Sequence, residues 1–140
     1  MIGVVLQERP VGAPPWTAFV VAVALTLVAL LFAIWTGRTA RRRLHVVTVC
    51  FLVPVLATAI YFAETVGSYW VFPAVPLQIH LGFAYTASAA TLLAVGSGIA
   101  HIRGWVRRST HAPVAWFFVA AAVGAVATGT WIFLVGSPRV

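Results

Sequence analysis

Four histidines and one acidic side chain lie inside or directly beside the apolar stretches of this 140-residue chain. They are His45, His80, His101, His111 and Glu64. An ionisable group is costly to place at membrane depth, so each of the five is a candidate site residue. Their positions along the chain divide them into two groups, one expected at each face of the membrane.

The first group consists of three histidines that are expected at the same depth, beside the arginine-rich segments. His45 begins the second apolar stretch, His101 ends the third and His111 precedes the fourth. Neutral imidazole binds copper or zinc, and two imidazoles can ligate a haem iron. We therefore predict a metal or haem site at these three residues, with copper and haem b as the candidate cofactors. In the competing interpretation each histidine caps a helix end or meets lipid headgroups, because no HxxxH or HxxE spacing makes a local half-site.

The second group is expected at the opposite face. Tyr61 and Glu64 lie three residues apart, on one side of the second stretch, and His80 follows at a similar depth in the third. We predict a contact between Glu64 and His80. It could handle protons, form half of a metal site or clamp two helices together, and the clamp is favoured because structural ion pairs are common.

Several other chemistries are excluded by what the chain lacks. His80 and His101 are 21 residues apart, which is about 31 Å along a helix, so a stacked pair of haems would need a further histidine near His80. The sequence has no CxxC motif, serine–histidine–acid set, glycine-rich phosphate loop or paired carboxylates, and it has no lysine for Schiff-base chemistry. We therefore expect a protein that is not an enzyme.

The elements that position these residues are four apolar stretches, and they indicate an all-α membrane protein. The chain is 62% hydrophobic and 8% charged, whereas soluble domains average roughly 45–50% and 25%. About 20 apolar residues cross the hydrocarbon layer as a helix. The whole chain, residues 1–140, is predicted to form one domain, a four-transmembrane-helix bundle in a lipid bilayer. The predicted spans are residues 16–36, 44–64, 77–102 and 113–135.

The arginines predict the orientation. Seven of the nine lie in the turns after the first and third spans. Short loops rich in arginine stay in the cytoplasm, so both termini are expected outside, in a multi-pass protein of the prokaryotic inner (cytoplasmic) membrane. The six tryptophans lie at or near span ends, as expected for the membrane interfaces. The net charge of +7 therefore marks orientation, and no nucleic-acid partner is predicted.

Small residues predict which spans pack closely. They recur at helical spacing in the third and fourth spans, for example at Ala121, Ala125 and Gly129, and such residues let membrane helices approach one another. The first span is rich in leucine, valine and phenylalanine. We therefore expect spans two to four to form the tight core, and the first span, including Leu30, to face lipid.

Four segments carry a resemblance to a known family. They are RRRLHVVTVCFLVP, IYFAE, FPAVPLQIHLGFA and RRSTHAPVAWFFVAAAVGAVATG, and the similarity covers roughly residues 38–134. In these segments the chain resembles an uncharacterised bacterial and archaeal membrane family, domain of unknown function 420, associated with haem–copper oxidase assembly genes. The resemblance carries over His45, His80 and His111 but not His101. Ala112 and Pro113 depart from the basic or hydrophobic residues usual after the last histidine.

The expected function is that of a non-enzymatic accessory membrane protein that handles a metal or haem during respiratory oxidase assembly. Its partners would be oxidase subunits or another membrane protein. One alternative is a b-type haem electron carrier. The other is a structural subunit of a larger membrane complex.

Overall fold

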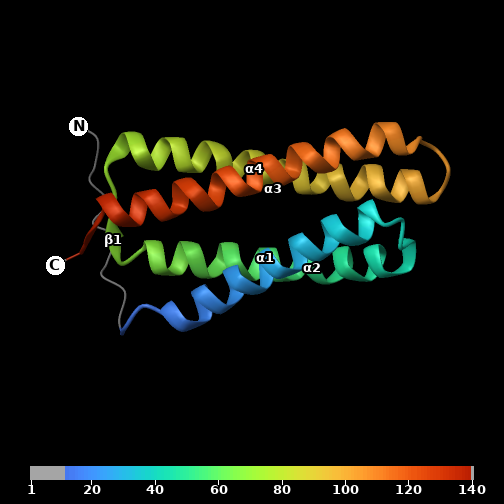
Figure 1. Ribbon diagram of the computed structural model, residues 1–140. Helices are drawn as coiled ribbons and strands as arrows, with labels where there is room; N and C mark the ends of the chain where they lie inside the picture. Colours follow the sequence, from blue (N-terminus) through green and yellow to red (C-terminus); the bar gives the residue numbers. More distant parts are fainter. Residues whose placement is uncertain (1–11, 140) are drawn as a thin grey trace.

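Four long helices form two antiparallel hairpins in the computed structural model, which describes residues 12–139 (Figure 1). The first hairpin consists of α1 (Trp16–Arg38) and α2 (Arg42–Gly67), and the second of α3 (Ala74–Ile102) and α4 (Arg108–Val135). Each helix is long and apolar enough to cross a membrane. The predicted fold class, a four-helix bundle of membrane-spanning helices, is confirmed.

The two arginine-rich turns lie side by side at one end of the bundle, which we call the arginine end (Figure 1). Both turns are short, and each contains a residue with positive φ: Ala40 at 55° and Gly104 at 77°. Such a backbone reverses the chain within a few residues, easily at glycine and less often at alanine. The start of α1 and the end of α4 lie at the opposite end, which we call the terminal end.

The helices are longer than the predicted spans, most clearly at the start of α4. This helix begins at Arg108, five residues before the predicted start at Pro113, so His111 lies inside the helix instead of preceding it. The spans were predicted from hydropathy, which detects only the apolar part of a helix. The helices themselves extend beyond this part into the polar residues of the membrane interface. α2 likewise begins at Arg42 and continues through Pro54, as membrane helices tolerate.

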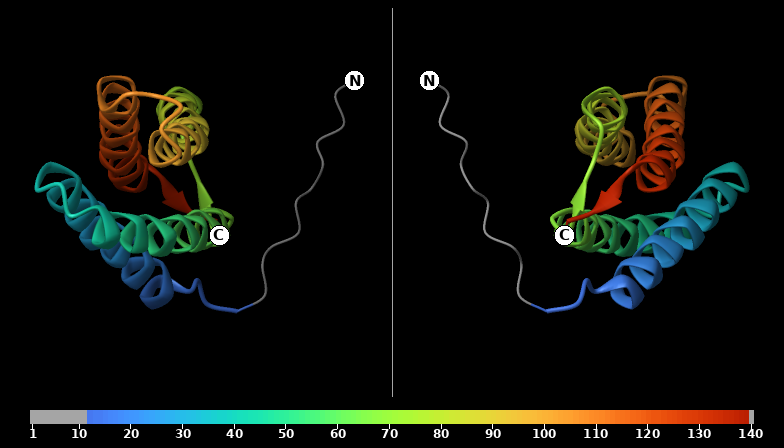
Figure 2. Two further views of the ribbon diagram at one scale, coloured as in Figure 1. Left: turned by 90° about the vertical axis from the view of Figure 1, so that its right-hand side faces the viewer. Right: turned by 90° about the vertical axis from the view of Figure 1, so that its left-hand side faces the viewer.

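The helices pack extensively within each hairpin, and Figure 2 shows the two hairpins as separate pairs of helices. One central cluster of side chains joins the hairpins. Its buried members come from all four helices: Ala29, Leu30, Ala33, Leu52, Ala90 and Phe118. Within the second hairpin, Gly124 lies directly against the Phe83 ring. The prediction that small residues bring α3 and α4 close together is confirmed.

The prediction that the first span faces lipid is wrong. α1 contains five buried residues, more than any other helix among the described residues, and the Leu30 side chain is only 7% exposed. Ala22, Ala29 and Ala33 give α1 a narrow face of small residues that packs against α2. The large apolar residues on the rest of the helix concealed this face in the sequence.

A pair of two-residue strands closes the terminal end, in two segments that lie outside the four predicted spans. β1 (Trp70–Val71) pairs antiparallel with β2 (Ser137–Pro138). Phe133 lies at the centre of an aromatic cluster there, with ring centroids 5.3–6.1 Å from those of its four neighbours, Trp16, Phe19, Trp70 and Phe72. Because these rings come from both hairpins, the cluster joins the hairpins at this end.

Candidate metal centre

His45 and His111 occupy equivalent positions in the two hairpins. Each is the fourth residue of the second helix of its hairpin, and each ends the sequence Arg-Arg-x-x-His. The two motifs, at residues 41–45 and 107–111, are 66 residues apart (111 − 45). Both imidazoles therefore lie at the same depth, one turn inside the arginine end. Their ring centroids are 6.5 Å apart, and their planes are inclined by 72°.

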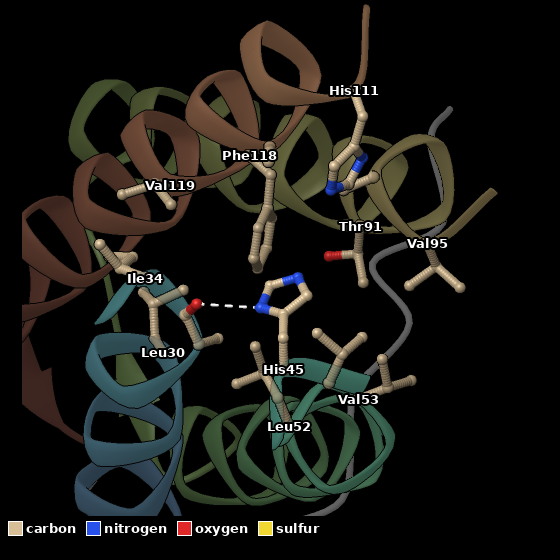
Figure 3. A pocket seen from close by; sticks show the side chains of 14 residues that line it. Leu30, Ile34, His45, Leu52, Val53, Thr91, Val95, His111, Phe118 and Val119 are labelled. Carbon is tan, nitrogen blue, oxygen red and sulfur yellow. Dashed lines mark hydrogen bonds between the residues drawn. The ribbon is translucent and has the colours of Figure 1, made fainter. Parts of the chain in front are cut away.

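A small apolar cavity lies between the two imidazoles, which enter it from opposite sides (Figure 3). Its volume is about 100 Å³. Thr91 adds a hydroxyl group to the wall, and that group donates a hydrogen bond to Ala87 O at 2.8 Å. The other lining residues are Leu30, Ala33, Ile34, Val49, Leu52, Val53, Ala94, Val95, Ala115, Phe118 and Val119.

Hydrogen bonding indicates which ring nitrogen of His45 carries a proton. Its Nδ1 lies 3.0 Å from Ala33 O and 3.3 Å from Thr36 Oγ1. A carbonyl oxygen only accepts, so Nδ1 carries a proton, and in the neutral ring Nε2 then holds the lone pair. The ring packs against Gly37, where an added Cβ would lie 3.3 Å from His45 Cε1.

The same arrangement recurs at His111. Its Nδ1 lies 2.9 Å from Ser97 Oγ, which donates its own proton to Ala94 O at 3.1 Å. With its proton on Ala94 O, Ser97 accepts from Nδ1, and in the neutral ring Nε2 again holds the lone pair. Gly98 lies against the ring, with a hypothetical Cβ 3.3 Å from Cε1. A proton held on one nitrogen by a neighbouring oxygen is the usual setting of a histidine that binds metal through the other nitrogen.

The spacing of the pair matches that of two imidazoles on opposite sides of one metal. With nitrogen–metal distances of about 2.0–2.1 Å and a ring radius of about 1.1 Å, the two centroids would be about 6.3 Å apart. The observed separation is 6.5 Å.

His101 lies beside this pair at the arginine end. Its exposed ring is parallel to that of His111, with centroids 6.1 Å apart, and its Nδ1 donates to Val106 O at 3.1 Å. Among residues 12–139, no group of three or more histidine, cysteine or acidic side chains is placed to hold a metal ion. The three histidines that were predicted to share one site therefore do not form such a group, and of the three only His45 and His111 line the cavity.

The polar residues near the terminal end do not come together as expected. His80 Nδ1 lies 3.2 Å from Thr128 Oγ1, and its ring packs against Gly129, both on α4. Glu64 is exposed, and no ion pair links it to His80 in the part of the chain that the structure describes. Tyr61, also exposed, packs edge-on against Phe62. The contact was predicted because Glu64 and His80 were expected at the same depth in the membrane. In the structure α3 pairs with α4, so the neighbours of His80 are residues of α4.

Two arginines join the hairpins above the cavity. Arg42 Nη2 donates to Ile102 O at 2.9 Å, and Arg108 Nη2 donates to Gly37 O at 3.1 Å. Each bond runs from the second helix of one hairpin to the end of the first helix of the other. The repeated motif thus supplies one histidine and one bridging arginine from each hairpin, a symmetry that the 66-residue offset could have revealed in the sequence.

Comparisons with family models, with curated proteins and with solved structures find no match for this chain. The resemblance to domain of unknown function 420 therefore stays a prediction, and the geometry of the histidine pair carries the functional argument.

Proposed function

We propose that this chain is a non-enzymatic membrane protein that holds one imidazole-ligated metal centre between His45 and His111. The observation that carries the proposal is a pair of imidazoles that line one apolar cavity, with 6.5 Å between their centroids, each with its Nδ1 beside an oxygen of the neighbouring helix. Two neutral nitrogen ligands suit copper and haem iron.

The surroundings favour a centre of low positive charge. The cavity wall contains no carboxylate, and the seven arginines of the two turns lie at the same end. A divalent ion here would be buried with its charge uncompensated, which is costly. Copper(I) carries one charge, and the porphyrin of haem neutralises the two charges of iron(II). These two centres fit the electrostatics better than zinc or copper(II).

The position of the pair suits a protein that accepts a centre and passes it on. The pair lies one helical turn from the arginine end, which the positive-inside rule assigns to the cytoplasm of a prokaryotic inner membrane. Combined with the resemblance to the oxidase-associated family, this supports a role as an accessory factor in respiratory oxidase assembly. Oxidase subunits would be the partners.

Titration of the purified protein in detergent tests the proposal. One equivalent of copper(I) or of haem should bind per chain, and His45→Ala and His111→Ala should each lower the affinity at least about a hundredfold. His80→Ala is the matched control, because this histidine also donates from Nδ1 and packs against a glycine but lies far from the pair. Equal losses in all three variants, or no binding by the wild type, would contradict the proposal.

The spacing of the rings also suits a second candidate, a b-type haem electron carrier, because two imidazoles can ligate a haem iron. The cavity of about 100 Å³ would hold a porphyrin only if the hairpins separated. This candidate requires the bound haem to be reduced and reoxidised reversibly without leaving the protein. If neither haem nor copper binds, the structural-subunit interpretation takes precedence.

A further inference from the structure

We propose that the arginine end binds the headgroups of anionic phospholipids through a single surface, the arginine surface, to which both turns contribute. The surface comprises seven exposed residues, Arg38, Arg41, Arg42, Arg43, Arg103, Arg107 and Arg108. None of them lines the cavity between His45 and His111, so binding at this surface needs no metal. The group that these arginines would bind is the lipid phosphate.

The two turns form one surface because each reaches the other. Arg42 Nη2 donates to the Ile102 carbonyl at the end of α3, 2.9 Å away, and in the opposite direction Arg108 Nη2 donates to the Gly37 carbonyl of α1 at 3.1 Å. The turns lie side by side in Figure 1, and the left view of Figure 2 looks onto this end. A phospholipid headgroup at the arginine end therefore meets arginines of both hairpins.

The positive charge of the surface has no acidic partner within residues 12–139. Arg42 and Arg108 donate to neutral carbonyls, and neither α2 nor α4 has an acidic residue in its first turn. Glu64, the one acidic residue in this part of the chain, lies near the end of α2, at the terminal end. A planar guanidinium group binds phosphate through two parallel hydrogen bonds. An anionic headgroup would therefore supply the charge that the protein itself does not.

Two tryptophans place the surface at the depth of the headgroups. The Arg41 guanidinium group lies over the Trp35 ring, 4.8 Å from its centroid. Arg103 lies over Trp105 in the same way, at 5.0 Å. Both rings are exposed, one on each hairpin, and tryptophan concentrates at the interface between hydrocarbon and headgroups. Stacking uses the face of the guanidinium plane and leaves the N–H groups at its edge for phosphate. This position favours a lipid over a soluble anion.

Electron paramagnetic resonance of spin-labelled lipids tests the selectivity of the surface. The full-length protein is reconstituted in phosphatidylcholine vesicles with a trace of spin-labelled phosphatidylglycerol or spin-labelled phosphatidylcholine, and the immobilised fraction of each label reports its affinity for the protein. The wild type should bind phosphatidylglycerol at least about fivefold more tightly, because one basic residue near an anionic lipid surface contributes about that factor. Salt at about 1 M should remove most of the preference, since exposed charges are screened.

The variants change one arginine in each turn. Arg43 and Arg107 are suitable because neither exposed side chain makes a hydrogen bond, ion pair or ring contact in the part of the chain that the structure describes. Arg43→Gln combined with Arg107→Gln should lower the preference at least about twofold, whereas Arg43→Lys combined with Arg107→Lys should keep it. Arg139→Gln is the matched control and should leave the preference unchanged, because Arg139 lies at the terminal end, where its Nε donates to Trp70 O at 3.1 Å.

Equal affinity of the wild type for the two lipids would overturn the inference, as would a loss in Arg139→Gln as large as that in the double glutamine variant. Glycerol phosphate, added to the vesicles, distinguishes the source of the anion. It should not displace the lipid, and displacement would overturn the inference in favour of an anion from solution. Each of these outcomes leaves the metal centre untouched, because titration with copper(I) or haem measures that centre separately.

Discussion

The two hairpins build the same half-site by different means. Both place a histidine one turn inside the second helix, pack its ring against a glycine of the first helix and bind its Nδ1 through an oxygen of that helix. In the first hairpin the principal oxygen is the backbone carbonyl of Ala33, whereas in the second it is the side-chain hydroxyl of Ser97. The hairpins thus share the position of the histidine and the glycine beside its ring, and they differ in whether a backbone or a side-chain oxygen lies at Nδ1.

The largest expected effect tests the packing of the first hairpin. Leu30 and Leu31 are neighbours on α1, but Leu30 is 7% exposed in the central cluster and Leu31 is 66% exposed. Leu30→Ala should lower the free energy of unfolding by about 2 kcal/mol, because removing a buried side chain leaves a cavity. Thermal unfolding in detergent measures this change. Leu31→Ala should have little effect, and equal destabilisation by both substitutions would mean that α1 does not pack as described.

A smaller effect distinguishes the two half-sites. Ser97→Ala removes the hydroxyl that orients His111, and loss of such a partner typically lowers metal affinity about tenfold. Thr36→Val is the matched substitution in the first hairpin and should change affinity less than about twofold, because Ala33 O still holds His45 Nδ1. Titration with copper(I) or haem measures both affinities. Equal losses in the two variants would show that the half-sites do not differ in this way.

Much of the fold could be predicted because membrane thickness sets the length of a helix. Four uncharged or nearly uncharged stretches of about 20 residues leave few alternatives to four spans. The residues at which the helices begin were less predictable, since α4 extends into polar sequence as far as Arg108. The role of α1 was also missed, because alanines among larger residues do not show which helix they meet.

The candidate site was predictable in depth but not in its lateral arrangement. The positions of His45, His101 and His111 within the predicted spans correctly placed all three at one end of the bundle. It could not show that His45 and His111 face each other while His101 stacks to one side, because that depends on how the two hairpins are placed. The same limit explains Glu64 and His80, which were paired by depth although His80 packs against α4.

The most direct test of the account is X-ray absorption spectroscopy at the metal edge of the loaded protein, whether the metal is copper or haem iron. If His45 and His111 both bind the metal, the spectrum should show scattering from two imidazole rings, with nitrogen atoms at about 2.0 Å from the metal. One ring should be lost in His45→Ala, one in His111→Ala, and none in His101→Ala or His80→Ala. A wild-type spectrum without imidazole scattering, or one that His45→Ala and His111→Ala leave unchanged, would contradict a metal centre held between the two hairpins.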